Sequence, residues 1–431
     1  MSEQQRMSTH DAKPLVVVGS GLAGYTFVRE FRKLNATRKL IMITADDGHS
    51  YSKPLLSTGF SKGKDADQLS MADAGKMAAQ LDIEIRTHTW VSRIDLEARS
   101  LALSFSDDAG QVTESLAFGE LVLALGADVV RPELAGSAAS EVLSVNSLAD
   151  YRRFREQIDR VGQHIRAAGS DRPIRVVIMG SGLIGCEFAN DLLASSEPAF
   201  SVDVVSPDER PLQRVLPEQI SRALEHALQE AGTSFHWRRT VRSVEHATTE
   251  APDCGGFSYS VVLGGVETEG EPQTLQADVV LGATGLRPHT ALASAAGLDV
   301  KRGIVVDRQL QTPVSGIYAL GDCAEVDGHL LLYVQPLMQC ARLLAANLAG
   351  GKAAEVSYQA MPVIVKTPAC PVVLATPPES VTGNWTVTEA DSADVKALFH
   401  DDENRLRGFA LSGRLVIEKQ TLLRELPPLH A

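Results

Sequence analysis

The chain has 431 residues, 44% of them hydrophobic, so it is long enough to form two or three globular domains. Its formal net charge of -13 argues against a dedicated nucleic-acid binder, which needs a basic surface. No stretch approaches the roughly 18 consecutive apolar residues of a membrane-spanning helix, and the polar leader Met1–Lys13 lacks the apolar core of a secretory signal.

Cysteine usage favours a reducing, cytoplasmic location. The chain has five cysteines, an odd number, and none of them belongs to a C-x-x-C motif. They are Cys186, Cys254, Cys323, Cys340 and Cys370. This usage indicates neither a disulfide framework nor a zinc site, so we assign no metal ligand.

The first predicted unit is a βαβ motif near the N-terminus. An apolar run over 15–18 has the composition of a buried parallel strand and leads into GSGLAG at 19–24. Helix-compatible sequence over 25–34 and a second apolar run over 39–44 follow. The three glycines of such a motif allow a tight turn, close approach of a pyrophosphate to the backbone, and close packing of helix on strand.

The same pattern recurs in the middle of the chain. An apolar run over 176–179 is followed by GSGLIG at 180–185, a helical stretch over 186–194 and a second strand over 201–205. One glycine motif alone is a weak signal. Two motifs, each with strand, glycines and helix in the right order, imply two doubly wound domains.

Each second strand should deliver an acidic group to an adenosine ribose. In the first unit, Asp46 and Asp47 follow the strand and either can serve. In the second unit, the residues at 206–209 are Ser-Pro-Asp-Glu, with no Lys or Arg to bind a 2′-phosphate, although Arg210 follows. We therefore favour NADH over NADPH as the nucleotide.

The last part of the chain changes character. Apolar strands over 120–125, 278–282 and 316–320 extend the doubly wound domains. A helical stretch over 333–348 then precedes short alternating segments, which suggest an antiparallel sheet. These segments cover 363–365, 372–375, 395–400 and 406–411. The predicted fold class is therefore α/β, with two doubly wound, Rossmann-like dinucleotide-binding domains and a C-terminal α+β domain.

Four motifs in this order resemble the pyridine nucleotide–disulfide oxidoreductase superfamily. They are GSGLAG at 19–24, GSGLIGCE at 180–187, ATGLRP at 283–288 and ALGD at 319–322. The resemblance covers roughly residues 14–431. Within the superfamily, YSKPLLSTGFSK at 51–62 and VKTPACP at 365–371 are similar to reductases of rubredoxin, a small iron-sulfur electron carrier.

The resemblance implies an FAD-binding domain over 14–146 and 278–330, an NAD(H)-binding domain over 147–277 and a C-terminal domain over 331–431. It also implies which residues hold the cofactors. Those for FAD are Ser20, Gly21, Leu22, Ala23, Thr44, Ala45, Lys53, Val91, Glu187, Asp322, Val334 and Lys366. Those for NAD are Gly180, Gly182 and Gly185.

Two differences from the wider superfamily stand out. Disulfide reductases carry a redox-active cysteine pair in the segment that follows the first βαβ unit, but residues 50–63 contain no cysteine. Related ferredoxin reductases carry a lysine at the position of Thr58, which pairs with the glutamate equivalent to Glu187, whereas here Lys53 takes their arginine position. The sequence therefore leaves the partner of Glu187 open.

The implied activity is transfer of hydride from NADH to FAD, followed by transfer of single electrons to rubredoxin. Hydride transfer needs no protein acid or base, so we assign no catalytic residue. The nearest alternative is an NADH-dependent ferredoxin or flavorubredoxin reductase. An alternative of another class is an FAD-binding redox sensor with little turnover.

Overall fold

The computed structural model describes residues 13–107, 110–247, 258–266 and 272–429. Contacts divide the chain into two compact units, and each unit is assembled from three separate stretches of sequence. Unit 1 holds the residues up to 52 together with 70–128 and 286–358. Unit 2 holds 53–69, 129–285 and 359–431.

Unit 1 is built on a parallel sheet of strand order β20-β9-β1-β2-β5. The strands are β1 (Leu15–Val18), β2 (Leu40–Ile43), β5 (Glu84–Arg86), β9 (Glu120–Leu123) and β20 (Ile317–Ala319). Both β1 and β2 are buried at every position, which explains why they are continuous apolar runs rather than alternating ones. Helix α2 (Leu22–Leu34) follows β1 and buries Phe27 and Phe31.

Smaller elements complete unit 1. The antiparallel strands are β6 (Trp90–Asp95), β7 (Ser100–Asp107) and β8 (Gly110–Ala117), and β3 (Ser50–Tyr51) with β4 (Ser70–Ala72). Strand β19 (Ile304–Val306) pairs in parallel with β21 (Ala324–Val326). The short helices are α4 (Ala74–Leu81), α8 (Ala291–Ala295) and the 3-10 turn Gly321–Cys323.

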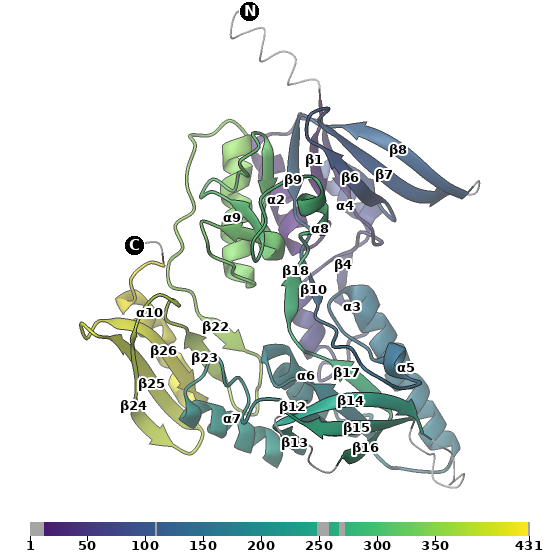
Figure 1. Ribbon diagram of the computed structural model, residues 1–431, viewed down its shortest axis with the longest axis vertical. Coiled ribbons are helices and arrows are strands. Elements are labelled where there is room, and N and C mark those ends of the chain that lie inside the picture. The colour runs from purple at the N-terminus through teal and green to yellow at the C-terminus, as the bar shows by residue number, and fades with distance from the viewer. Residues whose placement is uncertain (1–12, 108–109, 248–257, 267–271, 430–431) are drawn as a thin grey trace, which may run out of the picture. The chain divides into compact units, whose positions relative to one another are not determined.

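Helix α9 (Val334–Leu348) packs against α2 in unit 1 (Figure 1). The contact includes a hydrogen bond that the Thr26 hydroxyl donates to the Met338 sulfur at 3.3 Å. Sequence analysis placed this stretch in the C-terminal domain. The apolar pattern of a helix shows which face is buried but not which neighbour covers it, and here the contacts join α9 to unit 1. The division into three domains stays a prediction.

Unit 2 contains the second parallel sheet, of order β13-β12-β11-β17. The strands are β11 (Ile174–Met179), β12 (Phe200–Ser206), β13 (Thr233–Trp237) and β17 (Val279–Gly282). The helices of this part are α3 (Ala66–Leu69), α5 (Leu148–Ala167), α6 (Leu183–Leu193) and α7 (Glu218–Glu230), with the 3-10 turn Lys53–Thr58. A three-stranded meander, β14 (Arg239–His246), β15 (Tyr259–Gly265) and β16 (Gln273–Ala277), shares a buried cluster with one face of the sheet.

The C-terminal part of unit 2 is an antiparallel sheet of order β22-β23-β26-β25-β24. Its strands are β22 (Val363–Val365), β23 (Val372–Ala375), β24 (Gly383–Asp391), β25 (Asp394–Asp401) and β26 (Leu406–Ser412). One face packs on the apolar side of α7, and α10 (Lys419–Glu425) packs on the other. Two parallel nucleotide-binding sheets and this α+β part confirm the predicted fold class.

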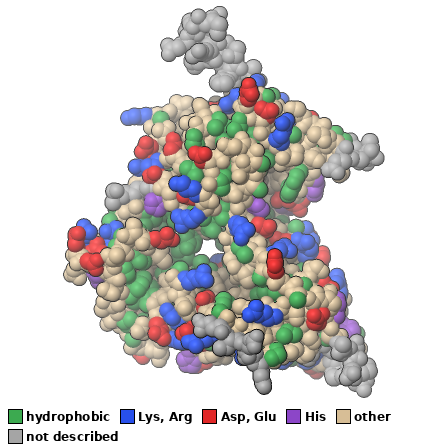
Figure 2. All heavy atoms as spheres, in the orientation of Figure 1, with side chains coloured by type: hydrophobic (Ala, Val, Ile, Leu, Met, Phe, Trp, Pro, Cys, Tyr) green, Lys and Arg blue, Asp and Glu red, His purple; other side chains and the backbone are tan. Residues whose placement is uncertain are grey.

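The surface carries charges of both signs, as expected from the 41 basic and 54 acidic residues of the sequence. The face in Figure 2 carries acidic and basic side chains interspersed with hydrophobic and uncharged ones. Within the part of the chain that the structure describes, no helix is long and apolar enough to cross a membrane.

Candidate functional site

The glycine loops of the two units share the same backbone geometry. Gly19 has φ +113° and Gly180 has φ +109°, a region that side chains other than glycine rarely adopt. A Cβ at these positions would lie 2.2 Å from the oxygen of Ala124 and 2.5 Å from that of Ala283. The chain therefore turns tightly against a neighbouring strand end in both units.

The other two glycines of each loop have different roles. A Cβ at Gly24 or Gly185 would lie 2.0 Å from a backbone oxygen of its own loop, so both glycines allow the helix to pack closely on the strand. A Cβ at Gly21 or Gly182 would meet no protein atom within 4 Å. These two glycines are also the N-caps of α2 and α6, and neither helix has a side-chain cap.

Open space in front of an uncapped helix N-terminus is what a bound pyrophosphate requires. The free N–H groups there donate hydrogen bonds, and the helix dipole favours negative charge. The residues present therefore fit a dinucleotide at each loop, which agrees with one FAD and one NAD(H).

An acidic residue is fixed beside the first loop by a chain of hydrogen bonds. The Ser20 hydroxyl donates to Thr44 Oγ1 at 2.8 Å, and Thr44 donates to Asp46 Oδ1 at 2.6 Å. Ser20 also lies 3.0 Å from the same Asp46 oxygen. Asp47 instead accepts the backbone N–H of His49. The structure thus distinguishes two acids that the sequence left equivalent, and Asp46 is the one held at the loop.

The second loop repeats this arrangement. The Ser181 hydroxyl donates to Ser206 Oγ at 2.8 Å, and Ser206 lies 3.5 Å from Asp208 Oδ2 while accepting the Asp208 backbone N–H at 3.2 Å. Glu209 is paired with Arg238 instead. Asp208 therefore corresponds to Asp46, and an acid rather than a base lies at this strand end.

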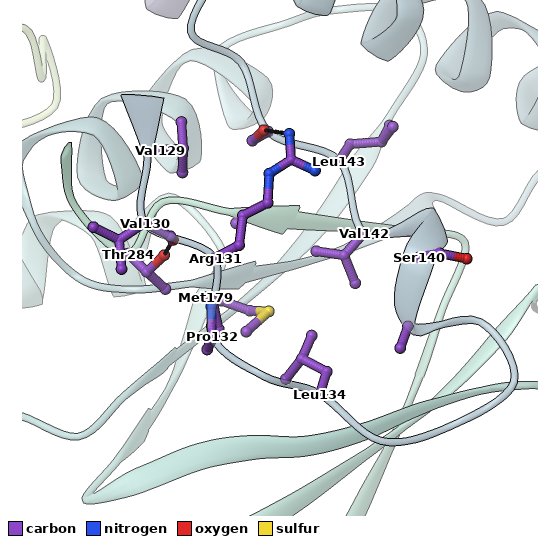
Figure 3. A pocket seen from close by; sticks show the side chains of 13 residues that line it. Val129, Val130, Arg131, Pro132, Leu134, Ser140, Val142, Leu143, Met179 and Thr284 are labelled. Carbon is purple, nitrogen blue, oxygen red and sulfur yellow. Dashed lines mark hydrogen bonds between the residues drawn. The ribbon is translucent and has the colours of Figure 1, made fainter. Parts of the chain in front are cut away.

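A cavity of about 300 Å³ lies at the carboxyl ends of β11 and β17. From β11 the chain adds β12 and β13 on one side and then returns to add β17 on the other side. The cavity therefore lies where the strand order reverses, the topological switch point at which such sheets bind ligands. Figure 3 shows Leu134, Val142 and Met179 around it. The Arg131 guanidinium also lines the cavity and donates to the Ser144 hydroxyl at 3.3 Å.

Glu187 on α6 is the centre of a buried polar cluster. Its side chain is only 4% exposed and pairs with the ammonium of Lys366 at 2.5 Å. The Ser57 hydroxyl donates to Glu187 Oε2 at 2.6 Å and accepts from Lys366 Nζ at 2.9 Å. The backbone N–H of Lys366 donates to Glu187 Oε1 at 3.1 Å. The partner of Glu187, which the sequence left open, is therefore Lys366.

Residues 13–343 match the protein-family model described as pyridine nucleotide-disulphide oxidoreductase. The chain belongs to this family. Residues 355–426 match a second model, described as a rubredoxin binding C-terminal domain. The resemblance deduced from the four sequence motifs is therefore confirmed.

Individual relatives agree with this assignment. The chain is 46% identical over 415 residues to the rubredoxin-NAD(+) reductase of Alcanivorax borkumensis, covering 96% of this chain and 98% of that protein. It is 34% identical over 414 residues to the nitric oxide reductase FlRd-NAD(+) reductase of Escherichia coli, covering 96% and 99%. The fold is similar to that of putidaredoxin reductase in its covalent complex with putidaredoxin, with a TM-score of 0.79, 23% identity and coverage of 96% and 94%.

This member of the pyridine nucleotide-disulphide oxidoreductase family has no reactive thiol among its described cysteines. Cys186, Cys323, Cys340 and Cys370 are buried and unpaired. Burial raises the pKa of Cys186 to about 12 and the pKa of the other three to about 11, which keeps them protonated. Cys254 lies outside the described residues.

The remaining FAD residues suggested by the family lie in separate places. In unit 1, Asp322 belongs to the 3-10 turn after β20. The preceding Gly321 lies so close to the first glycine loop that a Cβ added to it would be 2.8 Å from the Cβ of Ala23. Val334 is the first residue of α9, and Val91 lies on β6. The Asp322 turn is thus brought to the first glycine loop, although almost 300 residues of sequence lie between the two.

Unit 2 holds the rest of the suggested residues. Lys53 begins the 3-10 turn Lys53–Thr58. The same turn carries Ser57, which sequence analysis did not select. A serine in a turn gives no signal of its own, because its role depends on contacts to Glu187 and Lys366, which are far away in the sequence.

Proposed function

We propose that this chain is an FAD-dependent rubredoxin–NAD(+) reductase, which takes hydride from NADH and passes single electrons to rubredoxin. The observation that carries the proposal is the match of residues 355–426 to a rubredoxin-binding domain in a chain with two dinucleotide loops. The relative from Alcanivorax borkumensis, matched over almost its whole length, bears the name of this activity.

Bound FAD supplies the chemistry that converts one hydride transfer into two single-electron steps. For the protein, the task is to bind and orient the group. The backbone N–H groups at 20–23 bind its pyrophosphate, and Thr44 with Ala45 lies at the adenosine ribose. By the resemblance, the backbone of Val91 would pair with the adenine, and Asp322 and Val334 would lie by the ribityl chain and isoalloxazine. The structure supports this assignment through the open space at Gly21.

The buried cluster of unit 2 supplies fixed charge. By the resemblance, Lys53, Glu187 and Lys366 lie by the isoalloxazine. The Lys366 ammonium is held by two oxygens, those of Glu187 and Ser57, so it needs little reorganisation to stabilise negative charge near it. The absence of cysteine at 50–63 supports direct transfer of electrons from the flavin to the partner.

NADH binds at the second loop in this proposal, with its pyrophosphate at Gly180, Gly182 and Gly185. The Asp208 carboxylate accepts hydrogen bonds from the ribose hydroxyls and repels a 2′-phosphate. The switch-point cavity beside Met179 takes part of the nucleotide.

The proposed location is the cytoplasm. The proposal is supported by four described cysteines that remain thiols, as expected in a reducing compartment.

An anaerobic titration tests the function directly. NADH should bleach the flavin absorbance of the purified protein, and added rubredoxin should restore it rapidly. A colourless protein, or a reduced flavin that rubredoxin does not reoxidise, would overturn the proposal.

The Escherichia coli relative favours flavorubredoxin as a second candidate acceptor. Parallel assays with rubredoxin, flavorubredoxin and ferredoxin at equal concentration separate these partners by kcat/KM. Negligible NADH oxidation with every one-electron acceptor would instead indicate a redox sensor.

A further inference from the structure

Helix α6 carries three buried polar side chains on one face. Glu187, Asn190 and Asp191 are 3%, 5% and 3% exposed. Their spacing of i, i+3 and i+4 places them side by side along the helix. Polar side chains buried at this depth are costly unless they are hydrogen-bonded, so their partners indicate what the face is for.

Two of these side chains hold the turn that carries Lys366. The backbone N–H of Lys366 donates to Glu187 Oε1 at 3.1 Å, and the backbone N–H of Ala369 donates to Asn190 Oδ1 at 3.0 Å. Thr367 closes the turn, because its hydroxyl donates to the Cys370 oxygen at 2.8 Å. The backbone on both sides of Thr367 is therefore fixed to α6, and the Lys366 ammonium extends from a rigid base.

The third side chain holds the segment that carries Ser57. Asp191 accepts the backbone N–H groups of Phe60 at 2.9 Å and of Ser61 at 3.1 Å, together with the Ser61 hydroxyl at 2.5 Å. Ser57, on the same segment, donates to Glu187. One helical face therefore fixes two segments from opposite ends of the sequence, and these segments meet at Glu187.

We propose that Asn190 and Asp191 are positioning residues, which set Lys366 and Ser57 around Glu187 so that the ammonium is fixed for electron transfer. The role of Lys366 at the flavin rests on the proposed function, whereas its attachment to α6 does not. The N-terminus of α6 is also the second glycine loop. A single helix of 11 residues thus positions both the nucleotide loop and the charged cluster.

A purely structural role is the competing explanation. Burial raises the pKa of the Asp191 carboxyl above its ordinary value, although its bonds from Ser61 and Phe60 oppose this. A buried carboxylate is weak evidence for stability, since a well-packed apolar residue is often at least as stabilising. The test must therefore measure Lys366 itself rather than stability alone.

The variants are Asn190→Ala, Asp191→Ala and the conservative Asp191→Asn, in the full-length protein with FAD. Asn347→Ala is the matched control, because Asn347 also accepts the N–H of an alanine, Ala354, at 3.0 Å, but lies in unit 1. The first measurement is the rate at which the Lys366 amine is acylated, read by mass spectrometry with Lys396 as internal reference. The second is the midpoint potential of the flavin. The third is kcat and KM with NADH and a small acceptor.

We expect Asn190→Ala to raise the acylation rate of Lys366 about fivefold relative to Lys396. This is the factor that corresponds to the loss of one hydrogen bond, which contributes about 1 kcal/mol. The flavin potential should fall and kcat should decrease with KM for NADH unchanged. Asp191→Ala should do the same through Ser57. Asp191→Asn keeps one acceptor oxygen for Ser61 but places a donor at the Phe60 N–H, so its values should lie between those of wild type and Asp191→Ala. Asn347→Ala should change nothing.

Unchanged Lys366 acylation in Asn190→Ala would overturn the proposal, even if Asp191→Ala fails to fold. Faster acylation with an unchanged flavin potential and kcat would also overturn it, since the positioning would not serve the reaction. Failure of the wild-type protein to reduce rubredoxin would refute the proposed function alone, because the acylation rate still measures the attachment to α6.

Discussion

Replacing Lys366 by methionine removes the charge that compensates Glu187. Breaking a buried ion pair by removing one partner typically costs about 3–5 kcal/mol, because a buried charge remains. Here the Ser57 hydroxyl and the Lys366 N–H still contact the carboxylate, and the Lys366 side chain is 29% exposed, so water can replace part of the ammonium. We therefore expect a loss of about 2–3 kcal/mol at pH 8, or a fall in Tm of roughly 5–10 °C.

Thermal unfolding at pH 8, at two FAD concentrations to separate any change in FAD binding, measures this loss of stability. Lys396→Met is the control, because its partners Glu389 and Glu418 are 52% and 33% exposed, and an exposed pair is worth about 1 kcal/mol or less. The double variant Glu187→Gln/Lys366→Met should recover most of the stability. Equal Tm shifts for Lys366→Met and Lys396→Met at pH 8 would refute the reasoning.

Three further predictions concern the nucleotides and the partner. Gly21→Ala should fold but retain less FAD, because its Cβ meets no protein atom but fills space at the loop. Gly24→Ala should lower Tm, because its Cβ would lie 2.0 Å from a backbone oxygen. Flavin absorbance per chain measures the first effect and thermal unfolding the second. Wild type should prefer NADH over NADPH at least about tenfold in kcat/KM, roughly 1.4 kcal/mol, and Asp208→Ala should reduce this ratio; equal use by wild type would contradict the assignment. Lys62 and Lys64 are exposed in the segment that follows the Lys53–Thr58 turn, where their charge can attract an anionic partner. Lys62→Glu/Lys64→Glu should therefore raise KM for rubredoxin and change its salt dependence without affecting a small uncharged acceptor; equal losses with both acceptors would indicate damage at the flavin site.

The sequence was sufficient for features encoded within a few residues. Each glycine loop depends on three glycines, a preceding strand and a following helix, so both loops could be predicted from the pattern. Which acid lies at the first loop could not be predicted, because Asp46 and Asp47 differ only in the groups that donate hydrogen bonds to them, the Thr44 hydroxyl for Asp46 and the His49 backbone N–H for Asp47.

The polar cluster at Glu187 was beyond the sequence for a different reason. Its members are separated by 130 and 179 residues, and no local pattern shows that Ser57 and Lys366 meet. The neighbour of α9 could not be predicted for the same reason, because the periodicity of this helix does not identify α2 as the helix it contacts.

The distribution of α6's partners along the chain has a consequence for biosynthesis. Asp191 binds residues that are synthesised before it, whereas Glu187 and Asn190 also need residues 366–369, which leave the ribosome much later. The apolar side of α7 likewise waits for the strands of the C-terminal sheet. Because domains generally fold in the order in which they are made, unit 2 cannot complete its interior until translation is nearly finished. A nascent chain interrupted before residue 366 would leave the apolar face of α7 uncovered, and exposed hydrophobic surface of this kind makes an incomplete chain prone to aggregation.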